Sequence, residues 1–186
     1  MTKPFRVYLV RHGEASASWD TATDPGLSEE GGRQAATVGA VLAAQARCLV
    51  WSSPLLRAQQ TARPLAAAWQ AEVRIEDSVR ELPSAGVPLE TRRAWLKGVM
   101  QSRWEDVDAP LRDWRDRAWR VLCAAGEDVV VFTHFMVINA IASRATQDPR
   151  VMCFEPDYCS VTTLVAHDGG LVLEAFGKER PTLVNL

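Results

Sequence analysis

FRVYLVRHG, at residues 5–13, carries the clearest signal of the fold. Residues 5–10 are mostly β-branched, aromatic or aliphatic, and so short an apolar run predicts a strand buried within a sheet. The run ends at Arg11, His12 and Gly13, which places a guanidinium and an imidazole where the strand stops. Two further apolar runs, at 48–51 and 128–132, predict strands of the same kind.

Helical patterns separate these strands along the chain. Apolar residues recur at helical spacing after Ser28, after Ser53, over 90–101, after Asp108 and after Thr133. We expect the side chains of Ser28, Ser53 and Thr133 to cap their helices, because a hydroxyl can accept a backbone N–H of the first helical turn.

The predicted order is β-α-β-α-β, an insertion, and then α-β-α-β-β. The third strand falls at 72–76, and the last two, at 159–166 and 171–177, are typical of a terminal hairpin. Alternating strands and helices predict the α/β class. We expect a three-layer α/β/α sandwich, with a mostly parallel sheet and helices on both faces.

The composition predicts one domain and excludes two classes of partner. A chain of 186 residues, 47% of them hydrophobic, can bury one sizeable core, so we expect a single domain over 1–186 with a small lid insertion at about 82–108. The net charge of -2 offers no strong field for nucleic acid or an anionic membrane. The apolar runs are far shorter than the roughly 20 residues that span a membrane.

The cysteines favour a reducing environment and no metal. Cys48, Cys123, Cys153 and Cys159 form no C-x-x-C pair, and the chain has 3 histidines to share among any zinc sites. We expect buried free thiols, as in cytosolic proteins. Residues 1–4 lead straight into a strand without a hydrophobic signal region, which also favours a cytoplasmic location.

Charged and polar side chains follow three of the predicted strands. Arg11 and His12 come after the first, Arg57 comes soon after the second, and His134 comes after the strand at 128–132. Carboxyl ends of neighbouring parallel strands meet at one edge of a sheet, so these groups should converge there. Guanidiniums, imidazoles and helix N-termini together predict an anion site, and their geometry suits phosphate.

These residue types also suggest a reaction. Arginine charges disfavour protonation of His12, which should leave a neutral imidazole able to attack phosphorus. His134 would donate to the phosphoryl oxygens. Glu81, in the loop after the third strand, could protonate the leaving oxygen and later take a proton from water. The arginines supply positive charge, so we expect no metal and no other cofactor.

Four short motifs resemble those of one family. LVRHGE at 9–14 resembles the opening signature of the histidine phosphatase (phosphoglycerate mutase-like) superfamily, and LSEEG at 27–31 resembles its second motif. SSPLLRAQQTA at 52–62 is similar to the third motif, and FTH at 132–134 resembles the position of the second histidine. Four motifs in order are a specific signal. The chain most resembles the short, phosphatase-type members.

The resemblance implies a role for each site residue. His12 would be the histidine that is phosphorylated, and Arg11, Arg57 and His134 would form the phosphate pocket. Glu81 would be the proton donor, an assignment that rests on the shorter context REL at 80–82.

Three departures from the family pattern concern the substrate. Many members place an asparagine that touches phosphate a few residues after the first signature, and Ser18 is the nearest substitute here. Phe135 stands where many carry glycine, and PSAGVP at 83–88 replaces a stretch that is often rich in glycine and tryptophan.

We predict a metal-independent phosphatase that hydrolyses a small-molecule phosphomonoester, or a phosphohistidine, through a phosphohistidine on His12. An insertion of about 30 residues makes a short lid, and a short lid admits water. Two alternatives remain open, a phosphoglycerate mutase-type transferase and a non-catalytic phospho-ligand-binding protein.

The basic and tryptophan-containing segment 88–105 fits a substrate-selecting lid and an amphipathic surface helix equally well. The sequence does not indicate an oligomeric state.

Overall fold

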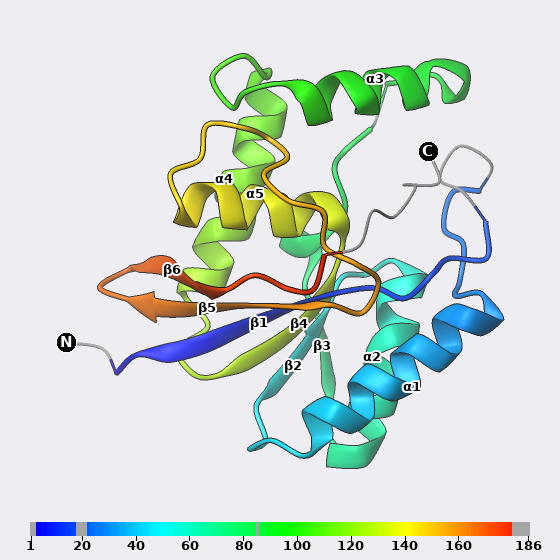
Figure 1. Cartoon of the computed structure of the whole chain (residues 1–186), viewed down its shortest axis with the longest axis vertical. Coiled ribbons are helices and arrows are strands. Elements are labelled where there is room, and N and C mark those ends of the chain that lie inside the picture. Colours follow the sequence, from blue (N-terminus) through cyan, green and yellow to red (C-terminus); the bar gives the residue numbers. More distant parts are fainter. Residues whose placement is uncertain (1–2, 18–21, 85, 180–186) are drawn as a thin grey trace.

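The computed structural model describes residues 3–17, 22–84 and 86–179, and these residues form a six-stranded sheet (Figure 1). Its spatial order is β3-β2-β4-β1-β5-β6. In chain order the strands are β1 (Phe5–Arg11), β2 (Leu49–Ser52), β3 (Val73–Ile75), β4 (Val129–Thr133), β5 (Val161–His167) and β6 (Gly170–Ala175). The strands β3, β2, β4 and β1 run parallel, whereas β5 and β6 are antiparallel to their neighbours. The mostly parallel sheet and the terminal hairpin are both confirmed.

Helices cover both faces of this sheet, as the alternating pattern predicts (Figure 1). The helices α1 (Glu29–Ala43) and α2 (Leu56–Trp69) pack together on one face, and α4 (Ala109–Cys123) and α5 (Phe135–Ala145) pack on the other. A short 3-10 helix, η1 (Asp77–Val79), follows β3, and α3 (Leu89–Gln101) lies in the insertion. The three-layer α/β/α arrangement is confirmed.

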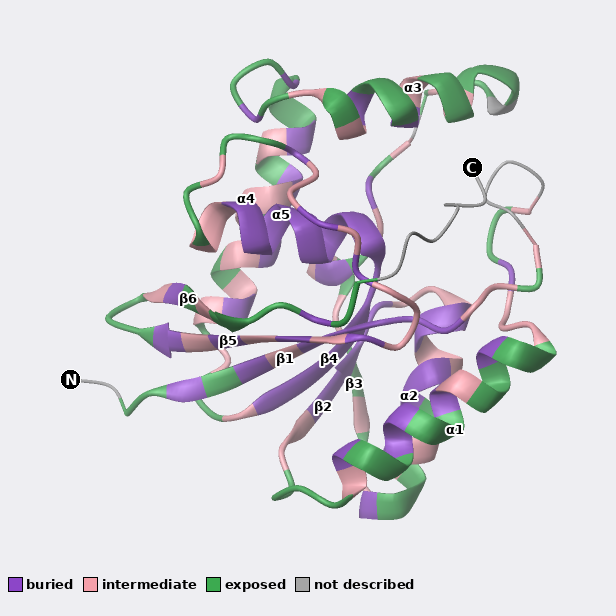
Figure 2. Ribbon diagram, in the orientation of Figure 1, coloured by how far each residue is buried: buried purple, intermediate pink, exposed green. Residues whose placement is uncertain are grey.

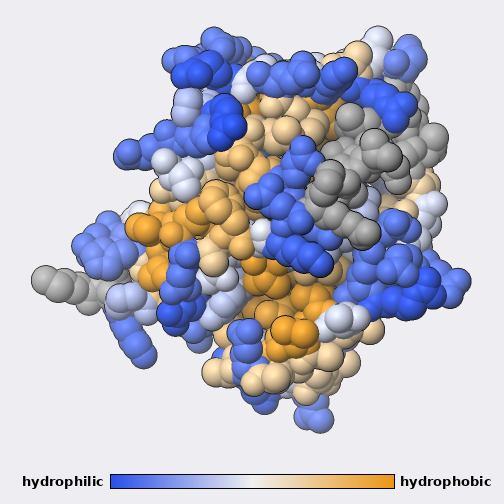
Figure 3. All heavy atoms as spheres, viewed as in Figure 1, coloured by the Kyte–Doolittle hydropathy of each residue, from blue (hydrophilic) through white to orange (hydrophobic). Residues whose placement is uncertain are grey.

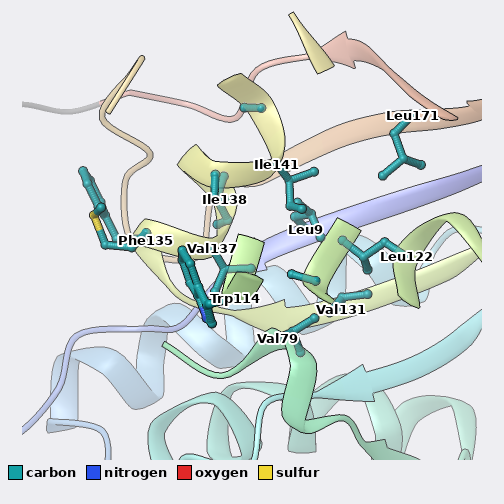
Figure 4. Packing of buried hydrophobic residues seen from close by; sticks show 14 of the residues in the cluster. Leu9, Val79, Trp114, Leu122, Val131, Phe135, Val137, Ile138, Ile141 and Leu171 are labelled. Carbon is teal, nitrogen blue, oxygen red and sulfur yellow. The ribbon is translucent and has the colours of Figure 1, made fainter. Parts of the chain in front are cut away.

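Each face of the sheet has its own apolar core. Strand β4 lies in the middle of the sheet and is buried at every residue (Figure 2). Its alternate side chains face opposite layers, so Phe132 packs towards α1 and α2 while Val131 packs towards α4 and α5. The second cluster is the larger one, and α5 brings Val137, Ile138 and Ile141 into it (Figure 4).

One of the three expected helix caps is confirmed and two are wrong. Ser28 accepts the N–H of Gly31 at 2.9 Å and caps α1. Helix α2 begins at Leu56 after Leu55, and α5 begins at Phe135 after His134, without a side-chain cap in either case. The Ser53 hydroxyl instead lies 2.7 Å from His134 Nε2, and Thr133 Oγ1 donates to the Val79 carbonyl at 2.7 Å.

The insertion that carries α3 is attached to the core by its apolar side chains. Leu96 and Val99 of α3 are buried in the cluster beside α4 and α5, and Trp104, just after the helix, is buried with them. The indole Nε1 of Trp104 donates to Ser143 Oγ at 2.8 Å, and the Arg115 guanidinium lies 4.3 Å from the Trp104 ring centre. Figure 1 shows α3 lying across the α4 and α5 layer.

The surface combines charged helices with a more apolar edge. Hydrophilic side chains cover most of α3 in Figure 3, whereas apolar ones gather near β6, where Val172 is exposed.

All four cysteines are free thiols of intermediate exposure, so the expectation that they are buried is wrong. Among the described residues, no helix is long and apolar enough to cross a membrane.

Candidate active site

The parallel strands bring the predicted site residues to one end of the sheet. Arg11, at the end of β1, lies in register with Thr133, at the end of β4. The N–H of His12 donates to the Thr133 carbonyl at 2.9 Å, which places His12 beside His134. The ring centres of the two histidines are 5.2 Å apart and the planes meet at 62°. The strand ends therefore converge, as their predicted order requires.

These site residues are buried despite their polarity. The exposed fractions are 4% for Arg11, 7% for His12, 5% for Arg57 and 0% for His134. Buried cations without a nearby counter-charge are costly, so a pocket that contains two guanidiniums favours an anionic ligand.

Two hydrogen bonds determine the tautomer of His12. Its Nδ1 lies 2.7 Å from the carbonyl oxygen of Gly13, which can only accept, so Nδ1 carries the proton. Its Nε2 receives the Nε–H of Arg57 at 3.1 Å, and a guanidinium can only donate, so Nε2 has a lone pair. His12 is therefore a neutral imidazole whose basic nitrogen faces Arg57.

The surroundings of His12 keep it in this neutral form. Burial lowers the pKa of His12 well below its ordinary value of 6.5, and the charges of Arg57 and Arg11 lower it further. The hydrogen bond to the Gly13 carbonyl opposes this shift without overcoming it. The expectation of an unprotonated His12 is thus supported, with burial as the largest cause.

The first turn of α2 positions Arg57. Thr61, one turn later, donates its hydroxyl to the Arg57 carbonyl at 2.7 Å and accepts the N–H of Gly13 at 3.1 Å. Asp24 accepts the N–H of Leu56 at 2.9 Å, and its carboxylate lies 3.9 Å from Arg57 Nη1. Within the described residues, Nη1 is buried and has no hydrogen-bond acceptor.

A loop before β5 holds Arg11. Its Nη1 donates to the Pro156 carbonyl at 2.8 Å, and its backbone carbonyl accepts the N–H of Cys159 at 3.0 Å. The guanidinium carbon lies 4.1 Å from the ring centre of Tyr158 and 5.1 Å from that of Phe135. In the described part of the chain, the Nε of Arg11 is buried without a hydrogen-bond partner. The aromatic contacts thus hold a cation that keeps a free N–H.

His134 lies opposite His12, with a different set of partners. Its Nε2 is 2.7 Å from Ser53 Oγ, and its Nδ1 has no partner among the described residues. Burial lowers the pKa of His134 well below 6.5, and the charge of Arg57 adds to this. Both histidines of the site are therefore neutral near pH 7.

Glu81 follows η1, and tertiary hydrogen bonds to the two preceding residues hold its segment. Thr133 Oγ1 donates to the Val79 carbonyl at 2.7 Å, and Trp114 Nε1 donates to the Arg80 carbonyl at 3.0 Å. The Glu81 carboxylate accepts the N–H of Leu82 at 3.0 Å. Thr133, expected to cap α5, thus helps to hold the acid-bearing segment.

The pKa of Glu81 depends on burial, on two backbone N–H groups and on the charges of both site arginines. Burial raises the pKa of Glu81 above its ordinary value. The N–H groups of Leu82 and Met136 and the charges of Arg57 and Arg11 act in the opposite direction. Glu81 is thus close enough to both arginines to interact electrostatically.

The first two motifs pack against each other through glycines. A Cβ on Gly31 would lie 2.1 Å from the Glu14 carbonyl oxygen, and a Cβ on Gly13 would lie 2.6 Å from the Gly31 carbonyl oxygen. Ser28 Oγ donates to the Glu14 carboxylate at 2.7 Å. Glu14 therefore supports the loop that carries His12.

This arrangement can bind a tetrahedral anion in front of a nucleophilic nitrogen. Arg11 Nε and Arg57 Nη1 have no hydrogen-bond partner among the described residues, and the lone pair of His12 Nε2 accepts from Arg57 Nε. In the described ranges, no three His, Cys, Asp or Glu side chains group as metal ligands would.

The sequence of this chain matches the model of one protein family over most of its length. The family model of the histidine phosphatase superfamily (branch 1) matches residues 7–179. The chain belongs to this superfamily. A search of curated protein sequences finds no match.

Solved phosphatases of this superfamily share the fold. A mycobacterial glucosyl-3-phosphoglycerate phosphatase is 23% identical, with a TM-score of 0.72 over 95% of this chain and 100% of that one. A phosphoserine phosphatase from Entamoeba histolytica is 21% identical, with a TM-score of 0.73 over 95% and 98%. The alpha-ribazole phosphatase of Shigella flexneri is 19% identical, with a TM-score of 0.74 over 94% and 96%.

The motifs of a histidine phosphatase do not reveal every residue of this site. Arg11, His12, Arg57 and His134 lie together, and Glu81 is within electrostatic range of the arginines. Ser18 lies outside the described residues. Sequence reasoning missed Tyr158, which contacts Arg11 from a distant loop that no motif marks, and it treated Ser53 as a cap.

Proposed function

We propose that this chain is a phosphatase that hydrolyses a small phosphomonoester through a phosphohistidine on His12 Nε2. The observation that carries the proposal is the 2.7 Å contact between His12 Nδ1 and the Gly13 carbonyl, which assigns the proton to Nδ1 and leaves a lone pair on Nε2. In the first step the Nε2–P bond forms while the bond from phosphorus to the leaving oxygen breaks. In the second, a water oxygen attacks phosphorus, the Nε2–P bond breaks, and free phosphate leaves.

In this proposal the cations stabilise the charge that gathers on the phosphoryl oxygens. Substrate binding draws the Arg57 guanidinium from Nε2 to the phosphoryl group, which frees the lone pair for attack. Arg11 offers its unpartnered Nε–H, and His134 offers a ring N–H. Fixed donors in a buried site stabilise such a transition state more strongly than water does.

Glu81 serves in both steps as the acid and base. It gives a proton to the leaving oxygen, and it takes a proton from the attacking water. Burial raises the pKa of Glu81, which helps it to hold a proton in the free enzyme, and the neighbouring arginines favour the ionised form that the second step requires.

We further propose that water, rather than a second organic hydroxyl, receives the phosphoryl group. A lid of about 30 residues admits water to the phosphohistidine, whereas a mutase must exclude it. The free cysteines support a reducing cytoplasmic location.

The decisive experiment traps the intermediate. The enzyme is mixed with a 32P-labelled phosphomonoester, quenched in alkali within milliseconds, and tested for protein-bound label that is stable in base and labile in acid. We expect this label in the wild type and none in His12→Asn, together with steady release of free phosphate. Isomerisation of phosphoglycerate in excess of phosphate release would indicate a mutase. Binding of vanadate without phosphate release from any ester would indicate a non-catalytic protein.

A further inference from the structure

Ser53 is buried, and its hydroxyl lies within hydrogen-bond distance of His134. Its Oγ lies 2.7 Å from His134 Nε2 and accepts the N–H of Leu55 at 3.3 Å. Its backbone N–H donates to the Phe132 carbonyl at 2.9 Å, which anchors the residue beside the end of β4. The hydroxyl is thus held between the ends of β2 and β4, beside a histidine with 0% exposure.

We infer that Ser53 is a positioning residue that sets the tautomer of His134. Its O–H donates to Nε2, which places the ring proton on Nδ1 and presents that N–H to the phosphoryl group. The inference rests on the proposed function for the use of this donor, but the tautomer itself is a property of the free protein.

The hydrogen bonds of the Ser53 hydroxyl favour a proton on Nδ1 of His134 over a proton on Nε2. With the proton on Nδ1, Ser53 Oγ accepts from Leu55 and donates to Nε2, so both roles of the hydroxyl are used. With the proton on Nε2, Oγ would accept twice, and its own hydrogen would have no acceptor among the contacts of the described residues. The unpartnered Nδ1 would then carry a lone pair, which repels phosphoryl oxygens.

A charged His134 would also donate from Nδ1, but its surroundings disfavour it. Burial and the charges of Arg57 and Arg11 lower the pKa of His134 well below 6.5, and the neighbouring His12 acts in the same direction. A neutral ring donates from one nitrogen only, so the partner of the other nitrogen decides which one. In this site that partner is Ser53.

The two histidines therefore use the same tautomer for opposite purposes. In His12 the Gly13 carbonyl holds the proton on Nδ1, and the ring presents the bare Nε2 as nucleophile. In His134 the Ser53 hydroxyl occupies Nε2, and the ring presents Nδ1–H as donor. The Gly13 carbonyl thus leaves His12 with a lone pair on Nε2, and the Ser53 hydroxyl leaves His134 with an N–H donor at Nδ1.

Nitrogen NMR of the histidine rings tests the inference directly. In 15N-histidine-labelled protein at pH 7, with His134 assigned through a His134→Gln variant, we expect its protonated nitrogen to be Nδ1. In Ser53→Ala we expect a mixture of tautomers. The matched control is Ser52→Ala, which removes a buried hydroxyl that bonds to the Ser53 carbonyl and not to His134, and it should keep the wild-type tautomer. A wild-type proton on Nε2 overturns the inference even if Ser53→Ala fails to fold.

Anion binding and turnover supply further readouts. We expect Ser53→Ala to weaken binding of inorganic vanadate and to lower kcat by about 10- to 100-fold, whereas Ser52→Ala stays within about threefold of wild type. An unchanged tautomer and unchanged vanadate affinity in Ser53→Ala would overturn the inference. Should no phosphomonoester be hydrolysed at all, the proposed function fails, while the NMR result still decides the role of Ser53.

Discussion

Arg57 donates its Nε–H to the Nε2 of His12 at 3.1 Å, so the guanidinium covers the lone pair of this imidazole. This contact aligns the imidazole and disfavours its protonation. Under the proposed function it also makes substrate binding a requirement for attack, because a phosphoryl group must compete for the guanidinium before Nε2 is free.

Replacing Arg57 with lysine should impair activity strongly. Lysine keeps the charge but lacks the planar fork that reaches both His12 and a phosphoryl oxygen. We expect kcat/KM to fall by about 100- to 1000-fold, measured with p-nitrophenyl phosphate. Arg63→Lys, on the exposed side of the same helix, is the matched control and should stay near wild type. Similar losses in both variants would contradict the role of Arg57.

Glu81→Gln should slow alkyl esters more than aryl esters. Alkoxides need a proton to leave, whereas nitrophenolate leaves without one, so the loss should be about 100-fold or more for alkyl esters and a few-fold for aryl esters. The two kcat/KM values are compared for wild type, Glu81→Gln and the exposed control Glu90→Gln. Equal slowing of both ester classes would remove Glu81 from the acid role.

The ring of Tyr158 should matter more than its hydroxyl. Tyr158→Ala removes the ring that lies 4.1 Å from the Arg11 guanidinium, and a cation–π contact contributes about 0.5–2 kcal/mol. We therefore expect KM to rise by roughly 2- to 30-fold in Tyr158→Ala and to change little in Tyr158→Phe. Steady-state kinetics would contradict this if the phenylalanine variant lost as much as the alanine variant.

Stability should fall as the pH drops from 7 towards 5. In the folded chain His12 and His134 have pKa values well below 6.5, whereas in the unfolded chain they take up protons near pH 6.5. The unfolded state then binds more protons, which costs up to about 1.4 kcal/mol per pH unit for each histidine. The raised pKa of Glu81 acts with the opposite sign, so variants must be compared with wild type.

Urea unfolding at pH 7.5 and 5.5 measures this dependence. His12→Asn should show a smaller loss of unfolding free energy at pH 5.5 than wild type. His167→Asn, which alters an exposed histidine at the end of β5, should show the wild-type loss. An identical pH dependence in all three proteins would show that His12 does not titrate as its burial requires.

Two adjacent glycines of α1 should respond differently to alanine. Gly31→Ala drives a Cβ into the Glu14 carbonyl oxygen, which would lie 2.1 Å away, and such overpacking costs about 1–3 kcal/mol. Gly32→Ala meets nothing within 4 Å and gains helix propensity. We expect the Tm to fall by about 2–12 °C in Gly31→Ala and to stay level or rise in Gly32→Ala. Equal Tm values would contradict the close packing of the two motifs.

Local sequence patterns predict the strand order along the chain, the α/β class and the residues that converge at the carboxyl ends of the strands. These features follow from local patterns, because the periodicity of apolar residues sets the element type, and parallel pairing brings strand ends together. Arg11, His12 and His134 could therefore be placed before the tertiary structure was known.

Several contacts within the site follow from tertiary packing and could not be predicted from local sequence. Ser53 has the local sequence of a helix cap, yet its hydroxyl bonds to His134 because β2 and β4 lie side by side. Tyr158 contacts Arg11 because β5 pairs with β1 and brings its preceding loop to the site. Long-range pairing of strands determines such contacts, and local patterns do not record it. The partner of His134 Nε2 is therefore distant in sequence, whereas the Nδ1 of His12 bonds to the adjacent Gly13 carbonyl and only its Nε2 contacts a distant residue, Arg57.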